Sequence, residues 1–245
     1  MVDRFFADAG LAALYDLFCP WEQRDDLAFY LPLVMSAPAV PDVGCGTGML
    51  LHQARRAGHA GRLCGLDPGV GMLEQARRRS DIEWILGDLT STGWDREFDL
   101  VVMTGHAFQV LVTDDEVRGA LAAVRSALTA GGRFAFETRN PPARAWQRWT
   151  PENAVEASDG RGGVVRMEPQ VQAPPAGDLV SFTTTFTGPG LGGPQVSRST
   201  LRFLDAATLS MLLSGAGLAV QEQYGDWDRQ PLADTSPEII TIAAR

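Results

Sequence analysis

Short apolar runs alternate with amphipathic segments through the first 140 residues of the chain. The runs cover 40–43, 62–67, 82–88, 98–103 and 131–137, and their length and apolar character indicate buried strands. The segments 48–57, 69–79 and 114–129 have the spacing of helices that hide one face. Strands and helices that alternate in this way form a parallel sheet covered by helices on both faces.

The segment 114–129 has the clearest helical pattern. Thr113 and Glu116 have the spacing of a capping box at its start, and Gly131 follows its end. We expect it to pack on the sheet through one apolar stripe, formed by Val117, Leu121, Val124 and Leu128. Two further helices, at 5–18 and 22–36, are predicted before the first strand.

After residue 140 the pattern changes to a region punctuated by glycine and proline. Strand-like runs at 163–168, 179–187 and 196–204 predict an antiparallel insertion. The earlier pattern then resumes with a helix at 206–214 and strands at 218–224 and 239–242.

Two proline sites bear on the strand limits. Pro41 lies in the first strand, where it cannot donate to a neighbouring strand, so we expect the strand to start late or to bulge there. Asn140, Pro141 and Pro142 follow the fifth strand, and we interpret them as the turn that ends it.

Composition and charge narrow the class of protein. The chain has 245 residues and is 45% hydrophobic, which suits a single large α/β domain. A net charge of −9 opposes binding to nucleic acid or to anionic membranes. There is no apolar run of 18 residues and no leader-like start, so we expect a cytoplasmic protein. We expect it to be a monomer or a homodimer. Its three cysteines have no metal-site spacing, and no metal is expected.

Residues 40–50 run a strand end into a three-glycine turn and then into a helix. Gly44, Gly46 and Gly48 permit positive φ and let a ligand approach the backbone closely. The N-terminus of the following helix adds free N–H groups and the positive end of its dipole. These features predict a nucleotide-binding turn.

Two further strand ends finish in an acid. Asp67 follows Gly48 by 19 residues, close to the distance of about 20 at which an acid meets ribose hydroxyls in nucleotide-binding folds. Asp88 ends the third strand, where it is placed to accept a hydrogen bond from the amine of an adenine. Either acid alone also fits a helix cap or a solvated loop. The order of the strand ends is what favours a nucleotide site.

Here the chain resembles the class I S-adenosylmethionine-dependent methyltransferases that act on small molecules. The turn at 42–48 is similar to their first motif, Gly65 to Pro68 with Met72 to their second, and Gly87 with Asp88 to their third. The resemblance covers residues 39–140 in the right order and spacing. It implies a Rossmann-like, doubly wound, mostly parallel seven-stranded sheet with a small antiparallel cap after strand five.

The resemblance also implies a domain plan and a reaction. We expect one methyltransferase domain with an N-terminal helical segment (1–37), a cofactor-binding core (38–140), a cap (141–204) and the C-terminal part of the core (205–245). S-adenosyl-L-methionine would be the cofactor and S-adenosyl-L-homocysteine the product, with the methyl group passing to N or O of a small molecule. The residues expected at the cofactor are Asp42, Gly44, Cys45, Gly46, Gly48, Asp67, Pro68, Met72, Gly87, Asp88, Leu89, Thr104, Tyr15 and Trp21.

Two other functions remain open at this point. An NAD(P)-dependent oxidoreductase would have glycine at position 49, but Met49 stands there. A protein that binds S-adenosylmethionine without catalysis would be expected to have lost motif glycines or acids, and none is lost here.

Several residues are candidates for the acceptor side of the site. His106 follows the fourth strand and is either a proton acceptor or a residue that shapes the pocket. Arg139 or Arg202 would pair with an anionic acceptor, or lie at the surface. Trp146 and Trp227 would line the acceptor pocket. Tyr15 and Trp21 would fold over the cofactor, as in similar methyltransferases, or pack as ordinary helix residues.

Overall fold

The computed structural model describes residues 2–158 and 162–245. Its larger sheet has seven strands in the order β3-β2-β1-β4-β5-β11-β10, and β11 runs antiparallel to both of its neighbours. The predicted seven-stranded, mostly parallel sheet is therefore confirmed. Its strands are β1 (Ala39–Val43), β2 (Arg62–Asp67), β3 (Glu83–Leu86), β4 (Phe98–Met103), β5 (Leu128–Arg139), β10 (Ala219–Tyr224) and β11 (Glu238–Ala244).

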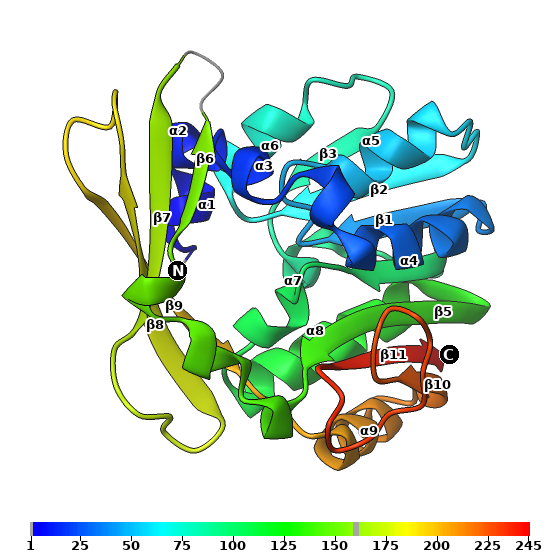
Figure 1. Ribbon diagram of the computed structural model, residues 1–245. Helices are drawn as coiled ribbons and strands as arrows, with labels where there is room; N and C mark the ends of the chain where they lie inside the picture. Colours follow the sequence, from blue (N-terminus) through cyan, green and yellow to red (C-terminus); the bar gives the residue numbers. More distant parts are fainter. Residues whose placement is uncertain (1, 159–161) are drawn as a thin grey trace.

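Helices cover both faces of this sheet (Figure 1). Side chains alternate along β4, so that Val101 and Met103 pack towards α8 and α9, whereas Leu100 and Val102 pack towards α4 and α5. The helices are α4 (Asp25–Met35), α5 (Met49–Arg56), α6 (Val70–Ala76), α7 (Leu89–Thr92), α8 (Asp114–Ala127) and α9 (Ala206–Gly215). Short 3-10 turns are η1 (Trp21–Gln23), η2 (Ala107–Val110), η3 (Pro141–Ala143), η4 (Ala145–Arg148) and η5 (Pro151–Asn153).

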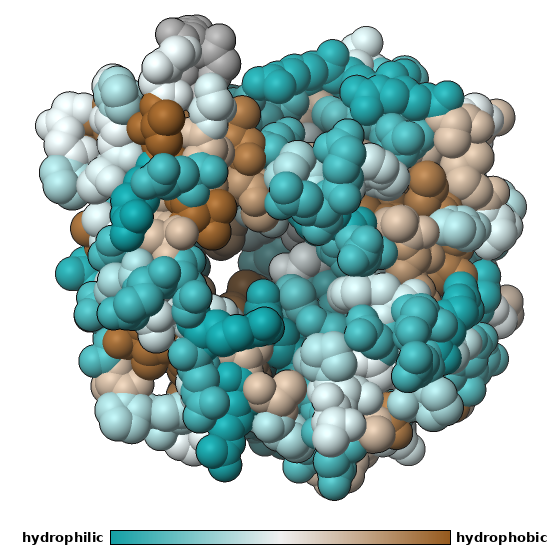
Figure 2. Space-filling view, in the orientation of Figure 1, coloured by the Kyte–Doolittle hydropathy of each residue, from teal (hydrophilic) through white to brown (hydrophobic). Residues whose placement is uncertain are grey.

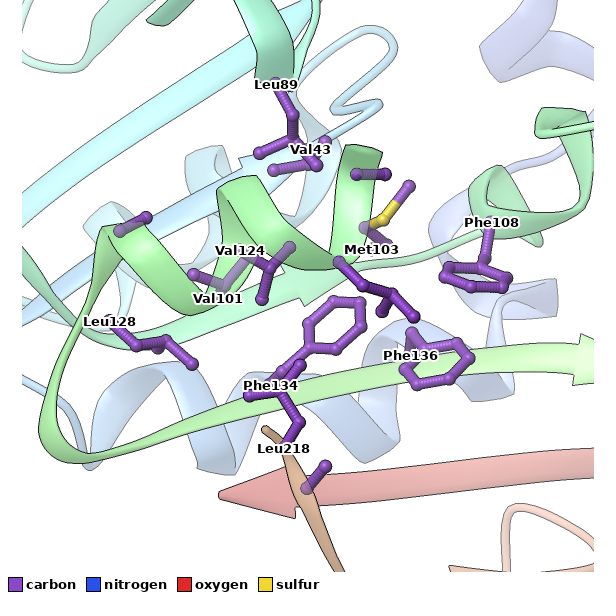
Figure 3. Close-up of a cluster of buried hydrophobic side chains, with 14 of the residues drawn as sticks. Val43, Leu89, Val101, Met103, Phe108, Val124, Leu128, Phe134, Phe136 and Leu218 are labelled. Carbon is purple, nitrogen blue, oxygen red and sulfur yellow. The ribbon is translucent and has the colours of Figure 1, made fainter. Parts of the chain in front are cut away.

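One of the two apolar layers joins β4, β5 and α8 (Figure 3). Phe134 and Phe136 stack with ring centroids 4.6 Å apart, and Phe108 of η2 packs on Phe136. The predicted stripe belongs to this layer: Val117, Leu121 and Val124 lie on α8, and Leu128, also buried there, is the first residue of β5. The Thr113–Glu116 capping box is also present.

The predicted helix at 5–18 is wrong in its continuity. The segment forms three short helices, α1 (Arg4–Ala7), α2 (Ala9–Ala12) and α3 (Tyr15–Phe18). Asp8 breaks it, because its backbone is extended and its Oδ1 accepts hydrogen bonds from the N–H groups of Gly10 and Leu11.

The expected irregularity at Pro41 is also wrong. β1 begins at Ala39 and keeps regular register with β2, with Pro41 opposite Cys64. Gly44 donates its N–H to Leu66 of β2, so alternation along the strand turns the nitrogens of Ala39 and Pro41 towards β4. The N–H of Ala39 meets the Asp99 carboxylate there at 3.2 Å. The missing donor of Pro41 therefore removes one bond to β4 without displacing the strand.

The predicted antiparallel insertion is confirmed as a second sheet, called the cap below. It has four strands in the order β6-β7-β8-β9: β6 (Val155–Ser158), β7 (Val164–Val171), β8 (Leu179–Thr187) and β9 (Gln195–Arg202). The edge strand β6 has no counterpart in the prediction, because it is only four residues long and largely exposed. The cap stands apart from the core, and the N-terminal helices lie beside it (Figure 1). None of the helices in the described residues has the length and apolarity of a membrane span.

Candidate active site

A cavity of about 550 Å³ lies at the carboxyl ends of β1, β2 and β4. The glycine turn and neighbouring loops form one wall, the N-terminal residues Asp3, Phe5 and Phe6 a second, and the cap strands β8 and β9 a third. The molecular surface opens between the cap and the core (Figure 2). Ligands of open α/β sheets bind at this edge, so the cavity is the candidate active site.

The glycine turn has the backbone that the sequence predicts. Gly44, Gly46 and Gly48 have φ values of +74°, +55° and +78°. A Cβ on Gly48 would lie 2.4 Å from the ring of Trp84, whereas a Cβ on Gly46 would meet nothing within 4 Å and would project from a residue that lines the cavity. The turn thus leaves room for a ligand beside the backbone of Gly46.

Two buried carboxyl groups lie beside this turn. Asp67 accepts from the N–H groups of Gly46 (2.8 Å) and Gly69 (2.7 Å), one at each oxygen. Asp42 is 1% exposed and its Oδ1 has no hydrogen-bond partner in the described residues. Burial raises the pKa of Asp42 to about 8, and the nearby charge of Asp67 adds to this rise. A buried acceptor without a partner at the edge of a cavity is suited to a polar ligand.

The remaining cofactor candidates divide into two groups. Those that line the cavity with Asp42, Asp67, Gly44 and Gly46 are Cys45, Pro68, Met72, Gly87, Asp88, Leu89, Thr104 and Tyr15. Gly48 does not line the cavity and faces the Trp84 ring instead. Asp88 also caps α7 by accepting from the N–H of Thr90 at 2.9 Å. Trp21 does not line the cavity and packs instead against the apolar layer on the α4 side of the sheet. Of the two interpretations of Trp21, the structure therefore supports that of a packing residue.

The N-terminal segment is tied directly to the glycine turn. Thr47 donates its hydroxyl to Asp16 at 2.6 Å. Tyr15 lines the cavity and packs against the rings of Phe5 and Phe6. Burial raises the pKa of the Tyr15 hydroxyl to about 12, so this group is a neutral donor at ordinary pH.

His106 lies at the cavity in a left-handed backbone conformation, with φ of +63°. Its N–H donates to Glu137 Oε1 at 2.6 Å, and its ring Nε2 is 3.0 Å from Glu238 Oε2. Glu137 also accepts from the Tyr30 hydroxyl at 2.6 Å. Burial lowers the pKa of His106 well below its usual range and raises those of Glu137 and Glu238 to about 8.

Neither of the two glutamates that hold His106 was predicted from the sequence. Glu137 ends an otherwise apolar run in β5, and Glu238 directly precedes the apolar run of β11. An acid at the edge of a buried strand was the available signal. Only the strand order shows that these two acids meet behind one histidine, because β5 and β11 are neighbours in the sheet.

The acceptor-side candidates are only partly brought together. Arg139 lines the cavity. Trp146 packs edge-on against Phe203, and Trp227 packs against Phe29 and Tyr30, both outside the cavity lining. The prediction that these two tryptophans line the acceptor pocket is therefore wrong. Arg202 is paired with Asp178 and Asp114, away from the cavity.

Comparisons with known proteins agree with this site. Residues 40–132 match a methyltransferase domain family. The chain is 28% identical over 215 residues to the cypemycin N-terminal methyltransferase of a Streptomyces species, covering 84% of this chain and 82% of that protein. It is similar in structure to DesVI of Streptomyces venezuelae, with a TM-score of 0.70, 24% identity and coverage of 95% of this chain and 97% of the other.

A second similar structure was solved with the cofactor bound. It is an amino pentose methyltransferase from Micromonospora echinaspora, with a TM-score of 0.67, 21% identity and coverage of 91% of each chain. Together with the motif order, these findings confirm the predicted resemblance. The chain is a class I S-adenosylmethionine-dependent methyltransferase, and S-adenosyl-L-methionine is its cofactor.

Proposed function

We propose that this methyltransferase transfers the methyl group to nitrogen or oxygen of a small-molecule acceptor held between the core and the cap. The observation that carries the proposal is the continuous cavity that extends from the glycine turn to the cap strands. A volume of about 550 Å³ is within the range of small-molecule sites, roughly 300–1,000 Å³. With the donor in part of this space, the remainder suits a small acceptor.

The donor half of the site would be built from the glycine turn and the two buried acids. The donor would approach the backbone closely beside Gly46, and the free lone pairs of Asp67 would accept hydrogen bonds from its ribose hydroxyls. Asp42 Oδ1, which has no partner among the described residues, would be hydrogen-bonded by the ligand. When bound, S-adenosylmethionine supplies a methyl group on a positively charged sulfur, with S-adenosylhomocysteine as the leaving product. The cavity walls would contribute mainly orientation and exclusion of water.

His106 would act on the acceptor. Its Nε2 is held by Glu238, and its Nδ1 is neither hydrogen-bonded nor fully buried in the described part of the chain. A hydroxyl acceptor must lose a proton during transfer, and His106 is the cavity residue placed to take it. An amine that arrives deprotonated needs this help less. The named relatives include an amino pentose methyltransferase and an N-terminal methyltransferase, which supports an amine among the acceptors.

The test is methyl transfer from radiolabelled S-adenosylmethionine to a panel of amines, alcohols and carboxylic acids. We expect at least one acceptor to be labelled. Donor binding is measured in parallel by calorimetry with S-adenosylhomocysteine, and Asp67→Ala should weaken it by about 1.5–3 kcal/mol while the variant remains folded. Asp95→Ala, which changes a side chain that is 78% exposed, is the control.

Three outcomes would overturn parts of the proposal. Tight donor binding with no transfer to any acceptor would favour a non-catalytic protein. Binding of NAD(H) in place of S-adenosylhomocysteine would remove the donor assignment altogether. Unchanged affinity in a folded Asp67→Ala variant would remove Asp67 from the donor site.

A further inference from the structure

Arg139 ends β5 at the wall of the cavity and is held there by neutral groups. Its Nη1 donates to Gln109 Oε1 at 3.0 Å, and its guanidinium lies 5.4 Å from the centre of the Trp149 ring. Gln109 is 1% exposed, and its amide nitrogen donates in turn to the Arg202 carbonyl of β9 at 2.9 Å. The guanidinium is therefore fixed in position without any charged partner in these contacts.

Two other arginines of this region, Arg24 and Arg202, are neutralised. Arg24, which also lines the cavity, binds Asp26 through two hydrogen bonds of 2.8 and 2.6 Å. Arg202 pairs with Asp178 and Asp114. In contrast, no ion pair with a carboxylate is formed by Arg139 within residues 2–158 and 162–245. Its neighbours Glu137 and Glu238 are bound to Tyr30 and His106 instead.

The free part of the Arg139 guanidinium is accessible. Within the described residues, Nε and Nη2 of Arg139 donate to no acceptor. Neither nitrogen is among the described buried side-chain atoms that lack a partner. Those groups are therefore not fully buried, and Arg139 is one of the residues that line the cavity. Burial also lowers the pKa of the guanidinium, and the nearby acids Glu238 and Glu137 offset only part of this cost of holding the charge away from water.

We propose that Arg139 binds an oxyanion of the methyl acceptor, either a carboxylate or a phosphate monoester. The planar guanidinium matches both groups, and a partly desolvated site strengthens the pair. Phe182 and Leu201 of the cap also line the cavity and would contact the body of the acceptor. This inference rests on the proposed function, because it concerns the acceptor of the same site.

The test measures binding and needs no turnover. Protein loaded with S-adenosylhomocysteine is titrated by calorimetry with benzoate, phenyl phosphate and the neutral benzamide. We expect saturable millimolar or tighter binding of at least one anion, about tenfold tighter than benzamide. The preferred anion distinguishes a carboxylate from a phosphate acceptor. Arg139→Gln should abolish the preference, Arg139→Lys should keep part of it, and Arg198→Gln, an exposed position on β9, should leave it unchanged.

Each contrary outcome is decisive. Equal binding of benzamide and the anions, no saturable binding of either anion, or an anion preference that survives in folded Arg139→Gln would overturn the inference. Folding of each variant is checked by its melting temperature and by its retained S-adenosylhomocysteine affinity. Anion binding without methyl transfer to any acceptor would refute the proposed function and leave the anion site standing, so the two failures are distinguishable.

Discussion

Asp42 is a buried acid beside the glycine turn, with its carboxyl group at 1% exposure and one oxygen unpartnered among the described residues. Its pKa of about 8 means that the folded protein holds a proton there which the unfolded chain, with an ordinary value of about 3.9, does not. Unfolding then releases a proton, so the free energy of unfolding falls as pH rises between about 4 and 8. The site therefore lowers stability near neutral pH in order to present an acceptor to a ligand.

This gives a prediction for Asp42→Asn. The neutral amide removes the cost of burying the acid, so the ligand-free variant should be more stable than the parent near neutral pH, by on the order of 1–3 kcal/mol. The gain should shrink as pH falls towards about 4, below which the parent carboxyl becomes neutral in both states. Urea unfolding across this pH range measures it, with Asp95→Asn as an exposed control. A variant less stable than the parent at every pH would contradict the assignment.

The His106–Glu238 contact links protonation to the form of the ring that faces the cavity. When Glu238 is neutral, its O–H donates to Nε2 and the ring carries its own proton on Nδ1. When Glu238 is ionised, Nε2–H donates to it and Nδ1 is free to accept. The charged or titratable groups that influence this pair are Arg139, Arg24, Glu137, Asp26 and Asp226.

Ionisation of Glu238 should therefore switch on proton acceptance by His106. With an alcohol acceptor, kcat should rise as pH passes through about 8, the pKa of Glu238. Glu238→Gln should flatten this rise because the amide does not titrate, and His106→Ala should lower the rate by roughly 10²–10⁴. The measurement is kcat against pH for the three proteins. A rise that persists unchanged in Glu238→Gln would separate the glutamate from the proton transfer.

At the scale of elements, the turn between β1 and α5 is fixed by its contact with β3. Gly48 has φ of +78° and faces the ring of Trp84, which also lies against Gly65 of β2. Any side chain at Gly48 would strain the backbone and would also collide with this ring. The position thus holds the start of α5 against the sheet.

A pair of glycine variants separates strain from collision. Gly48→Ala should lower stability by more than the roughly 1–2 kcal/mol expected for an alanine at positive φ alone. Gly58→Ala is the matched control, because Gly58 has φ of +93° and a Cβ there would meet nothing within 4 Å. Melting temperatures and S-adenosylhomocysteine affinity measure both effects. Equal destabilisation by the two substitutions would show that Trp84 does not constrain the turn.

The elements that the sequence predicted well were those with several agreeing signals. The helix at α8 had a capping box and an apolar stripe, and both are present. The predicted helix end at 129 is wrong by two residues, because α8 ends at Ala127 and Gly131 lies inside β5. The helix predicted at 5–18 had apolar residues but also contained Asp8. The apolar pattern does not account for the hydrogen bonds by which Asp8 caps a new helix. The effect of Pro41 on the regularity of β1 was overestimated. The sequence does not show which neighbouring strand the Pro41 nitrogen faces, because this depends on the register of the sheet.

At the scale of the whole molecule, the cap closes a site whose donor residues all lie in the core and N-terminal segment. The cap contributes Phe182, Thr184, Ser197, Ser199 and Leu201 to the cavity wall. The donor residues could be recognised from the sequence because they lie in short contiguous motifs that follow one another along the chain. The partners Glu238 and Gln109, and the exclusion of Trp146 and Trp227, depend on tertiary packing that no local pattern encodes.

Replacing residues 150–203 by a short Gly/Ser linker should therefore abolish methyl transfer and leave most of the donor affinity. Calorimetry with S-adenosylhomocysteine and the radiolabel assay measure the two properties. Should the shortened chain fail to fold, Phe182→Ala offers a smaller change to the same wall and should raise KM for the acceptor more than it weakens donor binding. Turnover that survives removal of the cap would refute its role.

The N-terminal segment touches both halves of the cavity. Phe5 donates its N–H to Ser197 of the cap at 3.0 Å, Ser199 donates to Asp3, and Asp16 accepts from Thr47 of the glycine turn. If the donor orders this segment when it binds, the acceptor pays less entropy to order it from the cap side, and the reverse also holds. We expect the two substrates to bind cooperatively. Because coupling between sites is reciprocal, the factor by which donor tightens acceptor must equal the factor by which acceptor tightens donor.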